Sequence, residues 1–314
     1  IRIPLSLDTF IVPKDDSYVY DKGLNSGSFS GDDPSTIIVR NDTRITGEVK
    51  NLDSTFFLSS NTTFEDEFDG VDDITGQDAI QMQDTVENID GSVFLGDNAT
   101  TNSINAVDSF RVGENSVLKG EINNLDGNVR VGQGSTAQDE IDGAQGSVTV
   151  GDNSLLEDSV ENIGGDVEIG SDSTVNTINN VKSLTLGSES TMKSEVNNIR
   201  GDINLGDDVV AMDEIDGASG NLTTGSNFTA QDDIANIDRD VTIGENSDTK
   251  VIKTIGGDLI LKDNVDVDGS ISSITGDIIC GDNVETQSDV CSNNNNSDDD
   301  DGNNGNGNNG NGRG

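Results

Sequence analysis

The chain has 314 residues, of which only 31% are hydrophobic and 4% aromatic, while 37 are glycine. Its 17 Lys and Arg residues are outnumbered by 60 Asp and Glu residues, which gives a formal net charge of −43. Such a surface repels nucleic acid and anionic membranes, so we expect neither nucleic-acid binding nor membrane insertion. The sequence contains no histidine, which excludes histidine-based triads, histidine general bases and the usual zinc sites.

Residues 1–38 differ in composition from everything that follows. All three prolines and both tyrosines of the chain lie here: Pro4, Pro13, Pro34, Tyr18 and Tyr20. We expect an N-terminal cap that covers the first turn of a repeat, or an arm that docks onto another subunit. The sequence begins at Ile1 rather than Met, which we interpret as a processed or truncated start, with any signal peptide already absent.

A repeat with the pattern apolar–x–apolar–Gly occupies residues 39–291 and is clearest at Val129-Arg130-Val131-Gly132. Its third residue returns after 17, 18 or 19 residues at every step. These landmark residues are Val39, Leu58, Gly76, Leu95, Val112, Val131, Val150, Ile169, Leu186, Leu205, Thr224, Ile243, Leu261 and Cys280. A short period sustained over this length indicates stacked structural units, and we predict about 13 coils.

A second period of 74 residues supports the first one. Segment 139–146 (DEIDGAQG) recurs as segment 213–220 (DEIDGASG), and segment 86–91 (VENIDG) recurs as segment 160–165 (VENIGG). We infer that the chain grew by duplication of blocks of four coils.

Within one coil the apolar residues keep fixed positions. In the coil from Val150 they are Val150, Leu156, Val160, Ile163 and Val167, with the small Ser154 at a tight position. This spacing fits short strands separated by corners, and it fits neither a helical period nor long alternating strands. The predicted fold is all-β: a single-stranded, three-sided parallel β-helix (β-solenoid) of about 60 Å at a rise of about 4.8 Å per coil, with its handedness left open.

The predicted corners carry glycine, asparagine and aspartate, which tolerate positive φ angles. Asn or Asp lies two positions after the landmark glycine at Asn98, Asn115, Asn153, Asp172, Asn246 and Asn283. Asparagine returns later in the coil at Asn88, Asn124, Asn162, Asn180, Asn198 and Asn236. Stacked asparagines can satisfy each other's amides, so we interpret these columns as corner ladders, with ligand binding as the alternative.

Calcium is the metal for which we consider ligands in the sequence. Asp266 and Asp268 lie in NVDVDG (264–269), which imitates the start of an EF-hand loop, although Thr275 stands where the acidic twelfth residue belongs. The alternative is a strand with inward valines. Glu140 and Glu214 belong to a predicted acidic column with Glu48, Glu67, Glu121, Glu195 and Asp233. Like charges stacked in this way favour bound cations or a salty medium. The alternative is that they only keep this face solvated and the protein soluble.

Several features indicate an extracellular or cell-surface protein. Cys280 and Cys291 are close in sequence and are predicted to form a disulfide, with two buried thiols as the alternative. Asn-x-Ser/Thr sequons, which are candidate glycosylation sites, occur at Asn41, Asn61, Asn98, Asn221, Asn227 and Asn295.

Residues 292–314 contain no apolar side chain and are predicted to be a disordered Asn/Gly/Asp-rich tail.

The run Val150-Gly151-Asp152-Asn153-Ser154-Leu155 follows the hexapeptide rule: apolar, Gly, two free positions, small, free. In this it resembles the hexapeptide-repeat left-handed β-helices, and it is also similar to bactofilin-type polymer-forming solenoids, which pack end to end into filaments. The resemblance is at the level of the fold. It does not extend to the acyltransferases of the hexapeptide family, because they use a histidine.

We therefore expect a non-catalytic structural protein, an acidic extracellular rod that forms filaments or acts as a cell-surface spacer or adhesin. Copies of the chain are the expected partners, associated end to end or side by side. Short corners and scarce aromatics argue against an enzyme cleft, and no cofactor other than calcium is expected. The alternative is a surface-recognition module that binds ice, mineral or polysaccharide, with or without calcium.

Overall fold

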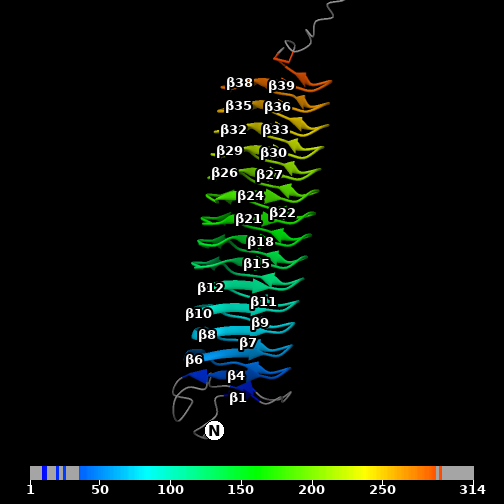
Figure 1. Cartoon of the computed structure of the whole chain (residues 1–314). Coiled ribbons are helices and arrows are strands. Elements are labelled where there is room, and N and C mark those ends of the chain that lie inside the picture. Colours follow the sequence, from blue (N-terminus) through cyan, green and yellow to red (C-terminus); the bar gives the residue numbers. More distant parts are fainter. Residues whose placement is uncertain (1–8, 13–18, 21–23, 26–34, 288–289, 292–314) are drawn as a thin grey trace, which may run out of the picture.

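The structure is a computed structural model that describes residues 9–12, 19–20, 24–25, 35–287 and 290–291. Every regular element in these ranges is a β-strand, and every pairing between strands is parallel. Each strand bonds to its counterpart in the preceding and following coils, so the described chain forms one tall stack (Figure 1). The predicted parallel β-solenoid of about 13 coils is confirmed.

The strands fall into three groups, which we call the first, second and third faces. The first face contains the landmark residues and consists of β1 (Thr9–Val12), β4 (Thr36–Val39), β15 (Val129–Val131), β18 (Val148–Val150), β21 (Asp166–Ile169), β24 (Ser183–Leu186), β27 (Ile203–Leu205), β30 (Leu222–Thr224), β33 (Val241–Ile243), β36 (Leu259–Leu261) and β39 (Ile278–Cys280).

The second face is a separate 15-stranded sheet. It consists of β2 (Val19–Tyr20), β5 (Arg44–Ile45), β7 (Thr63–Phe64), β9 (Gln81–Met82), β11 (Thr100–Thr101), β13 (Val117–Leu118), β16 (Thr136–Ala137), β19 (Leu155–Leu156), β22 (Thr174–Val175), β25 (Thr191–Met192), β28 (Val210–Ala211), β31 (Thr229–Ala230), β34 (Asp248–Thr249), β37 (Asp266–Val267) and β40 (Glu285–Thr286).

The third face consists of β3 (Leu24–Asn25), β14 (Ile122–Asn123), β17 (Ile141–Asp142), β20 (Val160–Glu161), β23 (Ile178–Asn179), β26 (Val196–Ile199), β29 (Ile215–Ala218), β32 (Ile234–Ile237), β35 (Ile252–Ile255) and β38 (Ile271–Ile274). Four longer strands bend from the third face onto the first: β6 (Val49–Leu58), β8 (Phe68–Gly76), β10 (Val86–Leu95) and β12 (Ile104–Val112). They join these two faces into one continuous sheet.

The interior is a narrow column of side chains, because the first face buries alternate residues, as at Ile203 and Leu205, and the third face buries residues three apart, as at Val196 and Ile199. One coil contributes Val148, Val150, Ser154, Leu156, Val160 and Ile163, all at most 3% exposed. Burial of each aliphatic side chain contributes about 1.5–3 kcal/mol, repeated along the stack. Three aromatic rings pack together in the core near the N-terminal end, where the rings of Phe56 and Phe64 lie 4.8 and 5.0 Å from the ring of Phe68.

The predicted corner chemistry is present in two columns of left-handed backbone. After the first face, positive φ angles occur at Asn61, Asn98, Asn115, Asn153, Asp172, Asn227, Asn246 and Asn283, among others. On the third face they occur at Asn51, Asn88, Asn124, Asn162, Asn180, Asn198 and Asn236. At Gly132, directly after the landmark residue of its coil, the backbones of neighbouring coils touch, and glycine is required there because any side chain would clash. A Cβ on Gly132 would lie 2.3 Å from the carbonyl carbon of Gly113 one coil away.

Corner carboxylates also hold the coils together. The Ser171 backbone N–H donates to the Asp152 carboxylate of the preceding coil at 2.8 Å, and the Asp282 N–H donates to Asp263 at 2.7 Å. Acidic and hydroxyl side chains of this kind satisfy backbone donors that the corner leaves without a sheet partner. Part of the large negative charge is therefore a structural component of the corners.

The stack begins before residue 39. β1 pairs in parallel with β4, with Phe10 opposite Ile37 and Val12 opposite Val39. β2 and β3 pair with β5 and β6 in the same way. The segment 1–38, predicted to be a cap or arm, thus contributes strands to one further coil, and its remaining parts lie outside the described residues. The predicted tail at 292–314 also lies outside them.

Candidate functional site

The described residues form a groove on the third face, at a position where the asparagine ladder is interrupted. In the intact part of the ladder the Asn180 Nδ2 donates to the Asn162 Oδ1 at 2.7 Å. Three coils of asparagine (Asn162, Asn180, Asn198) are followed by Gly217 and then by Asn236. Gly217 has no side chain in this column: the Asn198 Nδ2 donates to the side-chain oxygens of Asn179 and Asn197, and the Asn236 Nδ2 donates to the Asp216 carboxylate at 2.6 Å.

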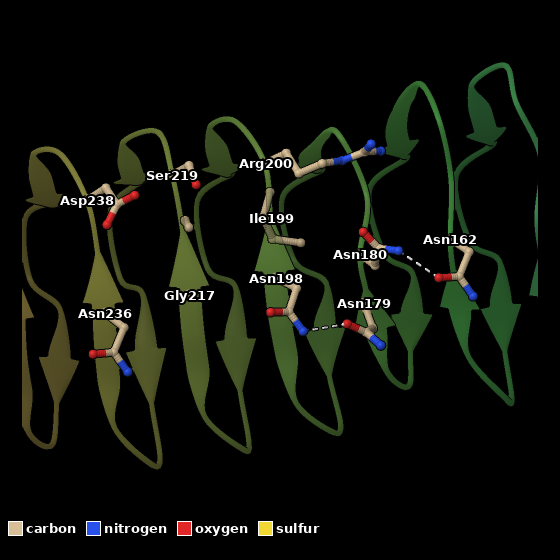
Figure 2. A pocket seen from close by; sticks show the side chains of 11 residues that line it. Asn162, Asn179, Asn180, Asn198, Ile199, Arg200, Gly217, Ser219, Asn236 and Asp238 are labelled. Carbon is tan, nitrogen blue, oxygen red and sulfur yellow. Dashed lines mark hydrogen bonds between the residues drawn. The ribbon is translucent and has the colours of Figure 1, made fainter.

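The interruption leaves a hollow of about 670 Å³. Figure 2 shows the asparagines along one side, Gly217 in the gap, and Arg200, Ser219 and Asp238 along the opposite corner. The lining residues are Asn162, Asn179, Asn180, Asn198, Ile199, Arg200, Gly217, Ala218, Ser219, Asn236 and Asp238. They come from β23, β26, β29 and β32, from the corners after these strands, and, for Asn162, from the corner after β20.

Arg200 forms one wall of the groove. Its Nη2 donates at 2.6 Å to the carbonyl oxygen of Ile163, which lies two coils earlier in the stack. This bond holds the guanidinium across the intervening coil, where Asn180 and Lys182 lie. Lys182 itself pairs with Asp166 at 3.1 Å. The exposed Asp238 carboxylate and Ser219 hydroxyl on the same corner form no hydrogen bond or ion pair within the described residues.

The groove offers hydrogen-bonding groups and no reactive ones. Asparagine amides both donate and accept, the guanidinium only donates, and the carboxylate only accepts. The lining contains no cysteine, lysine or tyrosine, and its single carboxylate has no second carboxylate beside it. The arrangement suits reversible recognition of a polar ligand rather than covalent or general acid–base chemistry.

The calcium candidates do not come together. Asp266 and Asp268 lie in or after β37 on the second face, whereas Glu140 and Glu214 precede β17 and β29 on the third face. Asp268 pairs with Lys250 at 3.2 Å, and Glu214 lies 3.8 Å from Lys253. Val265 and Val267 point inward and are 1% exposed, as the strand interpretation of NVDVDG requires. No group of three or more acidic or cysteine side chains suited to a metal occurs in the part of the chain that the structure describes.

The acidic column nevertheless perturbs its own members. The side-chain hydrogen bond with Glu161, together with burial, raises the pKa of Glu140 from 4.5 to about 7. Burial and the nearby carboxylate of Asp216 raise the pKa of Glu214. Burial and the carboxylate of Asp268 raise the pKa of Asp266. Burial is the largest cause of the shifts at Glu214 and Asp266, and nearby carboxylates add to it.

Cys280 and Cys291 form a disulfide, with an S–S distance of 2.02 Å and a Cα–Cα distance of 5.7 Å. The bond ties the end of β39 to the segment that follows β40. It therefore closes the last described coil onto the stack.

The structure places five of the six sequons on the surface or at its margin: Asn41, Asn61, Asn98 and Asn227 are exposed, and Asn221 is partly exposed. Asn61, Asn98 and Asn227 share the corner after the first face, with φ between 57° and 60°. The Asn227 Nδ2 donates to Asp208 at 3.0 Å, so at least one of these amides also belongs to a corner ladder. Asn295 lies outside the described residues.

The sequence reasoning identified the asparagine column but not the groove. The signal was Gly217, which stands in this column between Asn198 and Asn236, as Gly143 stands between Asn124 and Asn162. What the sequence did not reveal is that Arg200 reaches back over a whole coil and makes a wall.

No described residues form a helix long and apolar enough to span a bilayer. Comparison of the chain with protein-family models, with curated proteins and with solved structures finds no match in any of the three.

Proposed function

We propose that the chain is a non-catalytic structural protein, an acidic rod that works outside the cell or at its surface as a filament subunit or spacer. The observation that carries this proposal is the uninterrupted parallel stack from β1 to β40. Backbone hydrogen bonds run along the axis at every coil, and such stacking makes an elongated, stiff body. The disulfide and the exposed sequons support an oxidising, extracellular location.

The charge distribution favours end-to-end contact. On the third face, outward carboxylates recur along the stack at Glu67, Glu121, Glu140, Glu195 and Glu214. Two such faces repel each other when rods lie side by side. End-to-end contact would instead bring the strands of the last described coil against those of a second copy.

The last described coil has the properties of a docking end. Ile271 and Ile278 are partly exposed, whereas Ile252 and Leu259, their partners one coil earlier, are fully buried. Among the described residues, no strand pairs with the outer edge of β38, β39 or β40. A first coil from a second copy would continue the ladder and cover these side chains.

Negative-stain electron microscopy and sedimentation of the purified full chain at varied salt and calcium test the proposal. We expect rods that join end to end, and we expect Ile278→Lys to leave single rods. Ile279→Lys is the matched control, because Ile279 lies on the same strand but points outward and is 44% exposed. Thermal melting of both variants checks the fold. Wild-type chain that stays monomeric in every condition and attaches to no surface would count against the proposal.

A further inference from the structure

The groove at Gly217 is a local departure from the ladder that the fold itself does not require. Gly217 has a φ of +77°, a conformation that asparagine adopts in the coils on either side. A Cβ at this position would lie 3.5 Å from the Asn198 backbone nitrogen, which is an ordinary contact. An asparagine would therefore fit, and the missing side chain opens a hollow that a continuous ladder would fill.

Gly143 provides an internal comparison. It occupies the same column 74 residues earlier, with a φ of +67° and a Cβ position also 3.5 Å from the backbone nitrogen below, that of Asn124. There, however, the corner is closed by a hydrogen bond of 2.6 Å between Gln145 and Asp126. At Gly217 the equivalent corner presents Ser219 beside Arg200, and no bond joins them among the described residues. Of these two corners, only the one at Gly217 combines the gap with an open set of polar groups.

The polar groups of the groove select an uncharged ligand that both donates and accepts hydrogen bonds. An anionic ligand is disfavoured by the net charge of −43. A bound metal ion would need several oxygen ligands in one place, and the lining offers a single carboxylate, that of Asp238. An apolar ligand would leave the Arg200 and Asp238 groups unpaired. Hydroxyl groups, in contrast, match amide, guanidinium and carboxylate partners at once.

The shape of the groove favours a chain over a single small molecule. The lining follows one corner from Asn162 to Asn236, a span of four coil steps or about 19 Å at the β spacing. Its floor is made of Ile199 and Ala218, which are 1% and 2% exposed and leave little side chain above the backbone. An extended row of sugar rings could lie on this floor and direct hydroxyls to both walls.

We propose that the groove at Gly217 binds an uncharged polysaccharide. Asn198 and Asn236 bond hydroxyl groups on one side, while Arg200 and Asp238 bond them on the other. This site goes beyond the proposed role as a rod and does not depend on it, because the groove lies on the side of the stack rather than at an end.

The test is titration of the ¹⁵N-labelled full chain with neutral hexasaccharides of β-linked glucose, mannose and xylose, with a hexauronate as the charged comparison. We expect at least one neutral hexasaccharide to bind and to shift the amide signals of Asn198 and Asn236. Gly217→Asn, which fills the gap, is expected to weaken that binding at least tenfold. Gly143→Asn is the matched control and should bind as the wild type does.

Circular dichroism melts of both variants check that the solenoid is intact. The proposal is overturned if no neutral hexasaccharide binds, if the hexauronate binds more tightly, or if Gly217→Asn and Gly143→Asn bind equally well. Filament formation is scored separately by microscopy. A rod that assembles but binds no glycan would refute this site alone, and a monomer that binds glycan would refute the filament proposal alone.

Discussion

Glu140 and Glu161 show what regular stacking does to individual acidic residues. They belong to neighbouring coils on the third face, and a hydrogen bond between their carboxyl groups, with burial next in importance, raises the pKa of Glu140 from 4.5 to about 7. The protonated form is therefore favoured in the folded state. The resulting stability is fully present below pH 4.5 and is lost as the pH rises through about 7.

We predict that Glu140→Gln stabilises the protein at pH 8, because glutamine keeps the hydrogen bond without the charge. The expected gain in the free energy of unfolding is on the order of 1 kcal/mol after allowance for solvent screening, and it should disappear near pH 4. Urea unfolding between pH 4 and pH 8 measures it. The control is Glu157→Gln, on the second face between Gln138 and Asn176, for which we expect no pH-dependent gain. A gain from Glu140→Gln that is the same at every pH would contradict this explanation.

The buried serines illustrate a residue choice that the sequence predicted only as small. A column of inward-pointing serines lies directly before the strands of the second face: Ser116, Ser135, Ser154, Ser173 and Ser190. The Ser116 backbone N–H donates to the Ser135 hydroxyl at 3.0 Å, and the Ser173 N–H donates to Ser190 at 3.1 Å. The hydroxyls thus satisfy backbone donors that would otherwise be buried without a partner.

At the scale of strands and coils, the sequence predicted what recurs and missed what occurs once. The landmark residues all lie on the first face, including the atypical Gly76 and Thr224. The first coil was missed because Phe10 pairs with Ile37, 27 residues later, so the period of 17 to 19 is lost there. The groove was missed because the contact between Arg200 and Ile163 skips a coil, and a periodic pattern contains only nearest-neighbour relations.

The last coil depends on a covalent link that the other coils do not have. The Cys280–Cys291 disulfide closes a short segment around β40, and the aliphatic side chains of this coil are only partly covered. We predict that Cys280→Ser combined with Cys291→Ser increases amide exchange in β38, β39 and β40, because a closed loop of this size contributes about 2–3 kcal/mol.

Hydrogen exchange read by mass spectrometry measures this effect strand by strand. Each coil contacts only its neighbours, so exchange in β18, far along the stack, should not change. Equal acceleration throughout the chain, or none in the last coil, would contradict the expectation. The wild-type chain under reducing conditions should behave as the double variant does.

At the scale of the whole molecule, the described chain is a thin stack with a continuous core and strongly acidic sides. Its small hydrophobic fraction is sufficient because every coil buries the same few positions against the next. The proposed role requires its charge to repel neighbouring rods, and at physiological salt such repulsion acts over about one Debye length, roughly 8 Å. Length, stiffness and self-repulsion along the sides are the properties from which the proposed role follows.

The stacking is tested most directly by distances between spin labels on one column of the first face. Thr75, Thr149 and Thr223 are outward residues in register, and each is separated from the next by four coil steps. The described residues contain no free cysteine, so labels on introduced cysteines report these positions alone. Electron–electron dipolar spectroscopy should give about 19 Å for each neighbouring pair and about 38 Å for the outer pair, at a rise of about 4.8 Å per coil. Distances that do not add along a line would contradict the solenoid.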